Sequence, residues 1–141
     1  MSIVAVLAFR WDGRRDRLYF EMTPGSYNAE SLEPFIVNVK REMGRRKCIL
    51  LWDGLPAHKS KRMQDFLEEQ KRWLAVERLP SYAPDLNPVE SIWGNVKGQE
   101  LANFCAEKLD DAALAFGYGM ERIRKHHGLA QSFLQHSGLF I

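Results

Sequence analysis

Residues 79–93 read LPSYAPDLNPVESIW, and together with residues 48–53, CILLWD, they decide which fold the chain can adopt. The first stretch predicts a proline-rich loop that leads into a helix, with Asn87 as N-cap and Pro88 at the first helical position. Glu90 then falls on the first turn, where it can complete a capping box with Asn87. The second stretch predicts a buried strand that ends at Asp53. The chain therefore places one carboxylate at a strand end and another at a helix start.

Asp53 and Glu90 each admit a structural and a functional interpretation. An acid at the C-terminal end of a buried strand lies where open α/β sheets place their active sites, but an Asp before Gly54 is also a common turn-forming residue. A capping Glu90 needs no metal, although the cap also fixes the direction of its side chain. Position alone leaves these alternatives open.

Two other polar residues follow these carboxylates closely in the sequence. His58 lies five residues after Asp53, and it would contact a metal-bound water or a DNA phosphate if the loop folded back over the acid. A structural role is the simpler interpretation of a lone histidine. Lys97 lies two helical turns after Glu90 on the same side of the helix, where it could point at phosphate or simply be solvated.

The composition is that of an ordinary globular domain. The 141 residues are enough for a single domain with its own apolar core, without disulfides or a structural metal. A net charge of +2 does not by itself indicate a nucleic-acid partner. The basic residues are grouped, however, and such groups can make local positive patches. The groups lie within residues 45–47, 59–62 and 122–125.

The cysteines and the N-terminal segment indicate a cytoplasmic protein. Cys48 and Cys105 are far apart and lack the spacing of zinc ligands, so we expect buried free thiols in a reducing compartment. The apolar run at the N-terminus is too short to cross a membrane, and it lacks the basic region and cleavage site of a signal peptide. We therefore expect no membrane partner.

The order of predicted elements is that of a mixed α/β layer architecture. Apolar residues continue on both faces of the strand that ends at Asp53, which predicts a central strand covered on both sides. Asn28 or Ser31 is the expected N-cap of the first helix, and Gly44 the expected stop. The predicted strands are residues 3–11, 17–22, 47–53 and 74–79, with a turn at Asp12 and Gly13 joining the first two. The predicted helices are a first one ending at Met43, then 60–73 and 88–101, and a helical C-terminal third whose buried stripe is Leu109, Ala113, Phe116, Met120 and Ile123.

The blocks WDGLPAH at 52–58 and LPSYAPDLNPVESIWGNVK at 79–97 together resemble the catalytic core of mariner-type DDE transposases, most closely the bacterial insertion-sequence branch. In that family an Asp with a nearby His is followed, after a helix and a strand, by a Pro-Tyr-Ser-Pro-Asp-Leu-Asn-Pro-Ile-Glu-like motif and then Trp and Lys. The resemblance extends from about residue 3 to about residue 101 and is looser beyond. The matching residues are Asp53, His58, Tyr82, Pro84, Asp85, Leu86, Asn87, Pro88, Glu90, Trp93 and Lys97.

The resemblance implies an RNase H-like fold, with residues 1–141 as one catalytic domain and C-terminal helices from about residue 106. It implies that Asp53 and Glu90 bind two Mg²⁺ or Mn²⁺ ions, because hard cations prefer oxygen ligands. His58, Asn87 and Lys97 would be supporting or DNA-contacting residues. The implied reaction is hydrolysis at a transposon end followed by attack of the freed 3′-hydroxyl on target DNA. The implied partner is double-stranded DNA, in the bacterial nucleoid.

One part of the family pattern has no match, namely the first Asp of the triad and the strand that carries it. Asp12 and Asp16 fall in the hairpin turn at the wrong end of the strands, and Asp85 belongs to the loop motif. In the RNase H-like sheet the first strand is central, so residues 3–11 and 48–53 would each lose a hydrogen-bonding neighbour. We expect a strand from another polypeptide, direct pairing of these two strands, or a poorly stable fragment.

Two origins of such a chain follow from the resemblance. It could be the downstream product of a transposase encoded in two frames, in which case it would act as a homodimer or pair with the upstream-frame product. It could also be an inactive remnant that serves as a DNA-binding or dimer-forming regulatory module, with its basic groups supplying salt-dependent affinity. Either way, we expect the isolated chain to be weak or inactive in DNA cleavage.

Overall fold

The computed structural model describes residues 1–10, 12, 16–81, 83–105 and 108–139, and the chain divides into two compact units. We call Met1–Pro24 together with Asp85–Ile141 the terminal unit, and Gly25–Pro84 the middle unit. Trp11, Gly13 and Tyr82 entered the sequence interpretation but lie outside the described residues.

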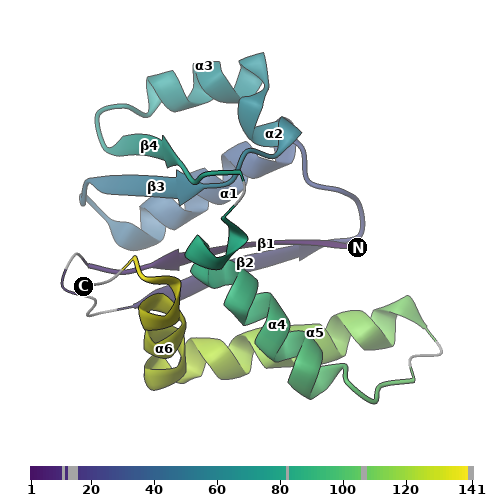
Figure 1. The fold of residues 1–141 in the computed structure, drawn as a ribbon. Helices are drawn as coiled ribbons and strands as arrows, with labels where there is room; N and C mark the ends of the chain where they lie inside the picture. Colours follow the sequence, from purple (N-terminus) through teal and green to yellow (C-terminus); the bar gives the residue numbers. More distant parts are fainter. Residues whose placement is uncertain (11, 13–15, 82, 106–107, 140–141) are drawn as a thin grey trace. The chain divides into compact units, whose positions relative to one another are not determined.

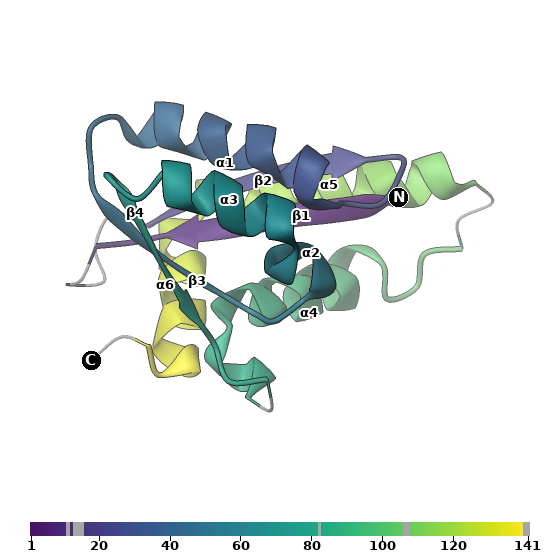
Figure 2. The same ribbon diagram turned by 90° about the horizontal axis from the view of Figure 1, so that it is seen from above.

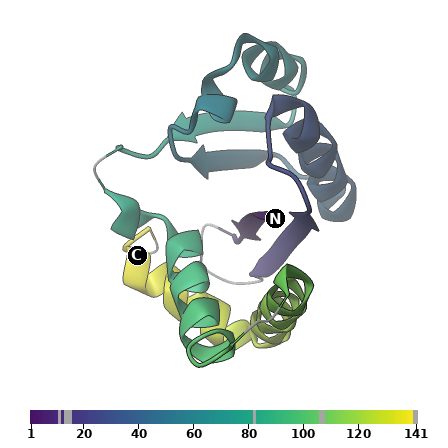
Figure 3. The same cartoon turned by 90° about the vertical axis from the view of Figure 1, so that its right-hand side faces the viewer.

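The terminal unit is an antiparallel hairpin with helices on one face. The predicted hairpin is confirmed, with Ser2 opposite Thr23 and Ala8 opposite Arg17, although its first strand ends at Ala8 and so before the predicted boundary. The helices pack on one another and against the strands (Figures 1 and 3). The elements are β1 (Ser2–Ala8), β2 (Arg17–Thr23), α4 (Pro88–Glu100), α5 (Leu109–Lys125) and α6 (His127–Ser137).

The core of the terminal unit lies between the hairpin and these helices. The predicted α5 stripe is confirmed at Phe116, Met120 and Ile123, but it is wrong at Leu109, which is 65% exposed. Leu109 is the first residue of the helix. The buried residues of this core are Leu7, Leu18, Ile92, Val96, Phe116, Met120, Ile123, Ala130 and Leu134.

The middle unit is a parallel strand pair with helices α1 and α3 side by side (Figure 2). Its register sets Cys48 opposite Leu74 and Trp52 opposite Arg78. The predicted helix over 60–73 ends early, because the chain turns at Gln70 and the Trp73 indole donates to Gln70 Oε1 at 2.9 Å. The elements are α1 (Ala29–Met43), β3 (Cys48–Trp52), α2 (Pro56–Lys59), α3 (Lys61–Glu69) and β4 (Leu74–Arg78).

Local signals set the ends of α1. Asn28 is the N-cap and Ser31 completes a capping box, because Asn28 Oδ1 accepts from the Ser31 N–H at 3.0 Å and Ser31 Oγ accepts from the Asn28 N–H at 2.9 Å. Gly44 ends the helix with φ at 73°, a left-handed value that favours glycine. The two candidate caps therefore act as one motif.

The prediction that β3 is covered on both faces is wrong. Ile49 is 68% exposed and Leu51 39%, whereas Trp52 is buried. Exposure that alternates with a period of two marks a strand with one covered face, which an apolar sequence cannot reveal. The described residues form two ladders, β1 with β2 in the terminal unit and β3 with β4 in the middle unit.

The described part of the chain contains no helix long and apolar enough to cross a membrane.

Candidate catalytic site

Asp53 directly follows β3, and its two carboxylate oxygens have different surroundings. Oδ1 accepts from the Leu55 backbone N–H at 3.2 Å, which closes a turn, so the turn-forming interpretation is confirmed. Oδ2 has no hydrogen bond or ion pair to any described residue, and 43% of the side chain is exposed. One oxygen therefore holds the loop while the other remains available to a ligand.

His58 is carried back over Asp53 by the short helix α2. Its Nδ1 lies 3.0 Å from Asp53 Oδ1 and 3.0 Å from the Asp53 carbonyl oxygen. An Nδ1 that faces two acceptors carries a ring proton and donates it. The ring also stacks on Trp52, with centroids 4.0 Å apart and planes 4° from parallel. His58 thus fixes the orientation of the Asp53 carboxylate.

Glu90 occupies the first turn of α4, but it is not part of a capping box. Asn87 is the N-cap as predicted, yet its Oδ1 accepts from the Val89 N–H at 3.1 Å and not from Glu90. The Glu90 side chain is exposed and makes no hydrogen bond or ion pair with a described residue. The capping box prediction is therefore wrong for this helix, and the carboxylate is not committed to the cap. Lys97 is exposed two turns further along α4 and likewise has no ion-pair partner in the described part.

Arg122 belongs to the basic group at residues 122–125, which the sequence analysis interpreted as a possible positive patch. In the structure Arg122 has a different role. Its Nε donates to Glu100 Oε1 at 2.7 Å, and its Nη2 donates to Glu100 Oε2 at 3.0 Å and to Asn95 Oδ1 at 2.8 Å. The hydrogen bonds to Glu100 raise the pKa of Arg122 above its already high ordinary value. Arg122 therefore ties α5 to α4, and it is not available to phosphate. No sequence pattern indicates this contact, because Glu100 lies 22 residues away from Arg122.

Asp16 also has a role that the sequence did not indicate. It precedes β2, only 8% of the residue is exposed, and Oδ2 lies 3.7 Å from Nδ1 of His127 at the start of α6. A carboxylate beside a helix N-terminus is electrostatically favourable. Asp16 is thus turned inward within the terminal unit.

A divalent ion needs several oxygen ligands, and the described residues supply them only in part. Asp53 Oδ2 and the Glu90 carboxylate are accessible hard donors that suit Mg²⁺ or Mn²⁺. No cluster of three or more His, Cys, Asp or Glu side chains that could hold a metal ion occurs among the residues that the structure describes. Each carboxylate suits such an ion chemically, but neither unit by itself supplies a complete ligand set among its described residues.

A family model described as "DDE superfamily endonuclease" matches residues 6–111 of the chain. The chain belongs to the DDE superfamily of endonucleases. The match spans β1 to the start of α5 and includes Asp53, His58, Glu90 and Lys97. No curated protein matches the chain. The comparisons do not assign the chain to a bacterial branch of the DDE superfamily.

Solved structures that match this DDE chain include several of the Mos1 transposase. The Mos1 transposase catalytic domain with raltegravir and Mn is 15% identical, with 97% of this chain and 76% of that chain covered and a TM-score of 0.54. The catalytic domain of Mos1 mariner transposase is 14% identical, with 97% and 74% covered and a TM-score of 0.53. A Mos1 paired-end complex with the left transposon end is 17% identical, with 96% and 44% covered and a TM-score of 0.56. The chain therefore has the RNase H-like fold of these catalytic domains.

Proposed function

We propose that this chain carries the catalytic residues of a transposase, which cleaves DNA at transposon ends and joins the freed 3′-hydroxyl to target DNA. The observation that carries the proposal is the state of the two family-motif carboxylates. Asp53 keeps one oxygen unbonded while His58 and the Leu55 N–H orient the other, and Glu90 is exposed and unused by the helix cap. The DDE family match and the bound DNA of the Mos1 paired-end complex support double-stranded DNA as the partner.

In this proposal Asp53 and Glu90 hold Mg²⁺ or Mn²⁺, and the Mos1 structures with Mn and with Mg support that choice of cation. When bound, two such ions would supply activation of the attacking oxygen and charge stabilisation of the leaving one. His58 donates its Nδ1 proton to Asp53 and so holds Oδ2 toward solvent. The helix start at Asn87 fixes the position of Glu90 within its own unit.

We further propose that the remaining carboxylate of the triad comes from a strand outside these 141 residues. The support is that β1 and β3 each have a single strand partner among the described residues, so each offers backbone groups to a further strand. Such a strand would come from an upstream segment or from another polypeptide.

A second candidate, a catalytically inactive DNA-binding or dimer-forming module, is favoured by the incomplete ligand set of the described residues. The two candidates differ in their metal binding. The test is to measure Mn²⁺ binding to the isolated chain by electron paramagnetic resonance. Nicking of supercoiled DNA is measured in parallel. We expect weak Mn²⁺ binding that falls by at least about tenfold in Asp53→Asn and in Glu90→Gln, and little or no nicking.

The matched control is Asp65→Asn, because Asp65 is an exposed acid that pairs with Lys61 on α3. Its Mn²⁺ affinity should equal that of the wild type. Mn²⁺ binding that is unchanged in Asp53→Asn and Glu90→Gln would overturn the assignment of these ligands. Strong nicking by the isolated chain that disappears in Glu90→Gln would show that two carboxylates suffice and that no further strand is needed.

A further inference from the structure

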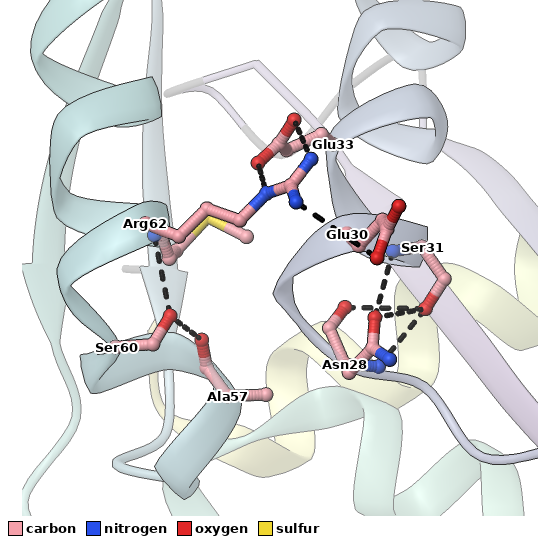
Figure 4. A network of polar contacts seen from close by, with 8 residues as sticks. Asn28, Glu30, Ser31, Glu33, Ala57, Ser60 and Arg62 are labelled. Atoms are coloured by element: carbon pink, nitrogen blue, oxygen red, sulfur yellow. Dashed lines mark hydrogen bonds and ion pairs between the residues drawn. The ribbon is translucent and has the colours of Figure 1, made fainter.

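The structure distinguishes among the three basic groups of the sequence. In the second group, Arg62 binds Glu33 through two hydrogen bonds of 2.7 and 3.3 Å and approaches Glu30 at 3.8 Å (Figure 4). Lys61 of the same group pairs with Asp65 at 2.6 Å. In the third group, Arg122 is held by Glu100 and Arg124 by Glu121. Most cations of these two groups are therefore already paired.

The first group, residues 45–47, is exposed and makes no ion pair within the described residues. It precedes β3, and the α3–β4 connection lies beside it at the same end of the strand pair (Figures 1 and 2). The Cys48 N–H donates to the Trp73 carbonyl at 2.8 Å, and Lys40 Nζ lies 5.2 Å from the centre of the Trp73 ring. The fold thus brings the end of α1 and the residues before β3 and β4 together.

We call the basic residues at this end of the middle unit the basic end. All of them are exposed, and Lys71 is paired with Glu68: Lys40, Arg41, Arg45, Arg46, Lys47, Lys71 and Arg72. The acidic residues in the same segments, 40–47 and 68–72, are Glu42, Glu68 and Glu69. Seven basic residues against three acidic ones leave an excess of four positive charges, which exceeds the +2 of the whole chain. The rest of the chain is therefore slightly acidic on balance.

We propose that the basic end binds the phosphate backbone of duplex DNA, in addition to the DNA contact at the catalytic carboxylates. This rests on the proposed DNA partner but not on the proposed metal ligands. Four of the cations are arginines, whose planar guanidinium groups bind phosphate through two hydrogen bonds. The aromatic residue of the region, Trp73, is engaged by Lys40 and by Gln70, so it is not free to stack on the bases of a single strand.

The place of the basic end in the sheet separates it from the candidate catalytic residues. It lies at the N-terminal ends of β3 and β4, whereas Asp53 follows the C-terminal end of β3. At about 3.3 Å per residue, the five residues of β3 separate the two ends by roughly 17 Å. A duplex in contact with both ends would present about ten phosphate charges over that distance. The basic end can therefore hold DNA without occupying the metal ligands.

The test is to measure the affinity of the full chain for a DNA duplex of arbitrary sequence. Binding is measured by fluorescence anisotropy over a range of NaCl concentrations in the presence of EDTA. The variant Arg45→Ala/Arg46→Ala/Lys47→Ala should bind at least about tenfold more weakly near 0.1 M salt, and its salt slope should fall by about one per lost phosphate contact. The matched control is Lys61→Ala/Arg62→Ala, because its cations are already paired. We expect the control to keep the wild-type slope. Circular dichroism must show that both variants remain folded.

Several outcomes would overturn this inference. One is equal loss of affinity in the two variants, and another is an unchanged slope in the 45–47 variant. Tighter binding to single-stranded DNA, or equal binding to vesicles of anionic lipid, would also reject duplex DNA as the occupant. Because EDTA removes divalent ions, these results do not depend on Asp53 or Glu90. If one of these outcomes occurs and Mn²⁺ binding still depends on Asp53 and Glu90, DNA binding at the basic end is rejected and the proposed metal ligands are retained.

Discussion

Arg122 and Glu100 form a two-pronged ion pair that joins α5 to α4, with Nε 2.7 Å from Oε1 and Nη2 3.0 Å from Oε2. In the same region, a Cβ on Gly119 would lie 2.7 Å from Glu100 Oε2. The carboxylate of Glu100 therefore sits against the backbone of α5 and is held there by Arg122. Arg122, which lies in a basic group of the sequence, therefore contributes to the packing of the terminal unit.

Replacement of Arg122 by lysine should lower the free energy of unfolding by about 1–2 kcal/mol, because lysine keeps the charge but loses the two-pronged geometry. Urea unfolding followed by circular dichroism measures this. Arg124→Lys is the control, since Arg124 forms an exposed pair with Glu121 within one helix and the substitution should cost less than about 0.5 kcal/mol. A double-mutant cycle with Glu100→Gln should show coupling. Additive effects of the two substitutions would contradict the ion pair.

The two glycines of α5 should respond in opposite directions to replacement by alanine. At Gly119 the new methyl group would meet Glu100 Oε2 and Val96 Cγ1 at 2.7 Å, and such overpacking costs about 1–3 kcal/mol. At Gly117 the nearest atom is Met22 Sδ at 3.6 Å, an ordinary contact, so the helix propensity of alanine should stabilise by up to about 1 kcal/mol. Thermal unfolding of the two variants tests this directly. A gain in stability from Gly119→Ala would show that α4 and α5 are further apart than described.

The ion pair between Arg62 and Glu33 should make part of the stability of the middle unit depend on pH. The hydrogen bond from Arg62 lowers the pKa of Glu33 below its ordinary value. A group whose pKa is lower in the folded state contributes stability above its unfolded pKa, and that contribution is lost as the pH falls through the folded pKa. Arg62→Ala should therefore lower the melting temperature at pH 7, and the difference from the wild type should shrink below about pH 4.

The control for that pH dependence is Glu33→Gln, which removes the titrating group. In this background the effect of Arg62→Ala on the melting temperature should vary less between pH 3 and pH 7 than in the wild type, with Glu30 as the acid that remains near Arg62. The pair is exposed, so the effect at pH 7 should be small. A constant difference between the wild type and Arg62→Ala at all pH values would show that Arg62 acts through packing of its alkyl chain and not through Glu33.

The elements that sequence alone could predict are those set by neighbouring residues. The N-cap at Asn28, the stop at Gly44 and the helix start at Asn87 depend on side chains that reach two or three residues along the chain. The contact of His58 with Asp53 also spans only five residues. The sequence therefore located the motif residues and their elements, and the resemblance in residues 52–58 and 79–97 supplied the fold that connects them.

The features that sequence could not predict depend on residues that are distant along the chain. Which face of β3 is covered depends on the helices that pack against it, and an apolar run is the same in either case. The role of Arg122 depends on Glu100 in another helix, and the basic end depends on the pairing of β3 with β4. The predicted capping box of Asn87 and Glu90 was wrong for a different reason. The Asn87 side chain accepts from the Val89 N–H, and Glu90 takes no part in the cap.

Substitutions of Asn87 and of Glu90 should therefore change the free energy of unfolding by different amounts. Asn87→Ala removes the side chain that caps α4 and should cost about 1 kcal/mol of unfolding free energy. Glu90→Ala removes a side chain without a described partner, so it should change that energy by less than about 0.5 kcal/mol. Urea unfolding of both variants tests this. Similar losses of stability in the two variants would indicate that Glu90 does take part in a capping box. A stable Glu90→Ala chain that has lost Mn²⁺ affinity would mean that this carboxylate binds the ion and does not stabilise the helix.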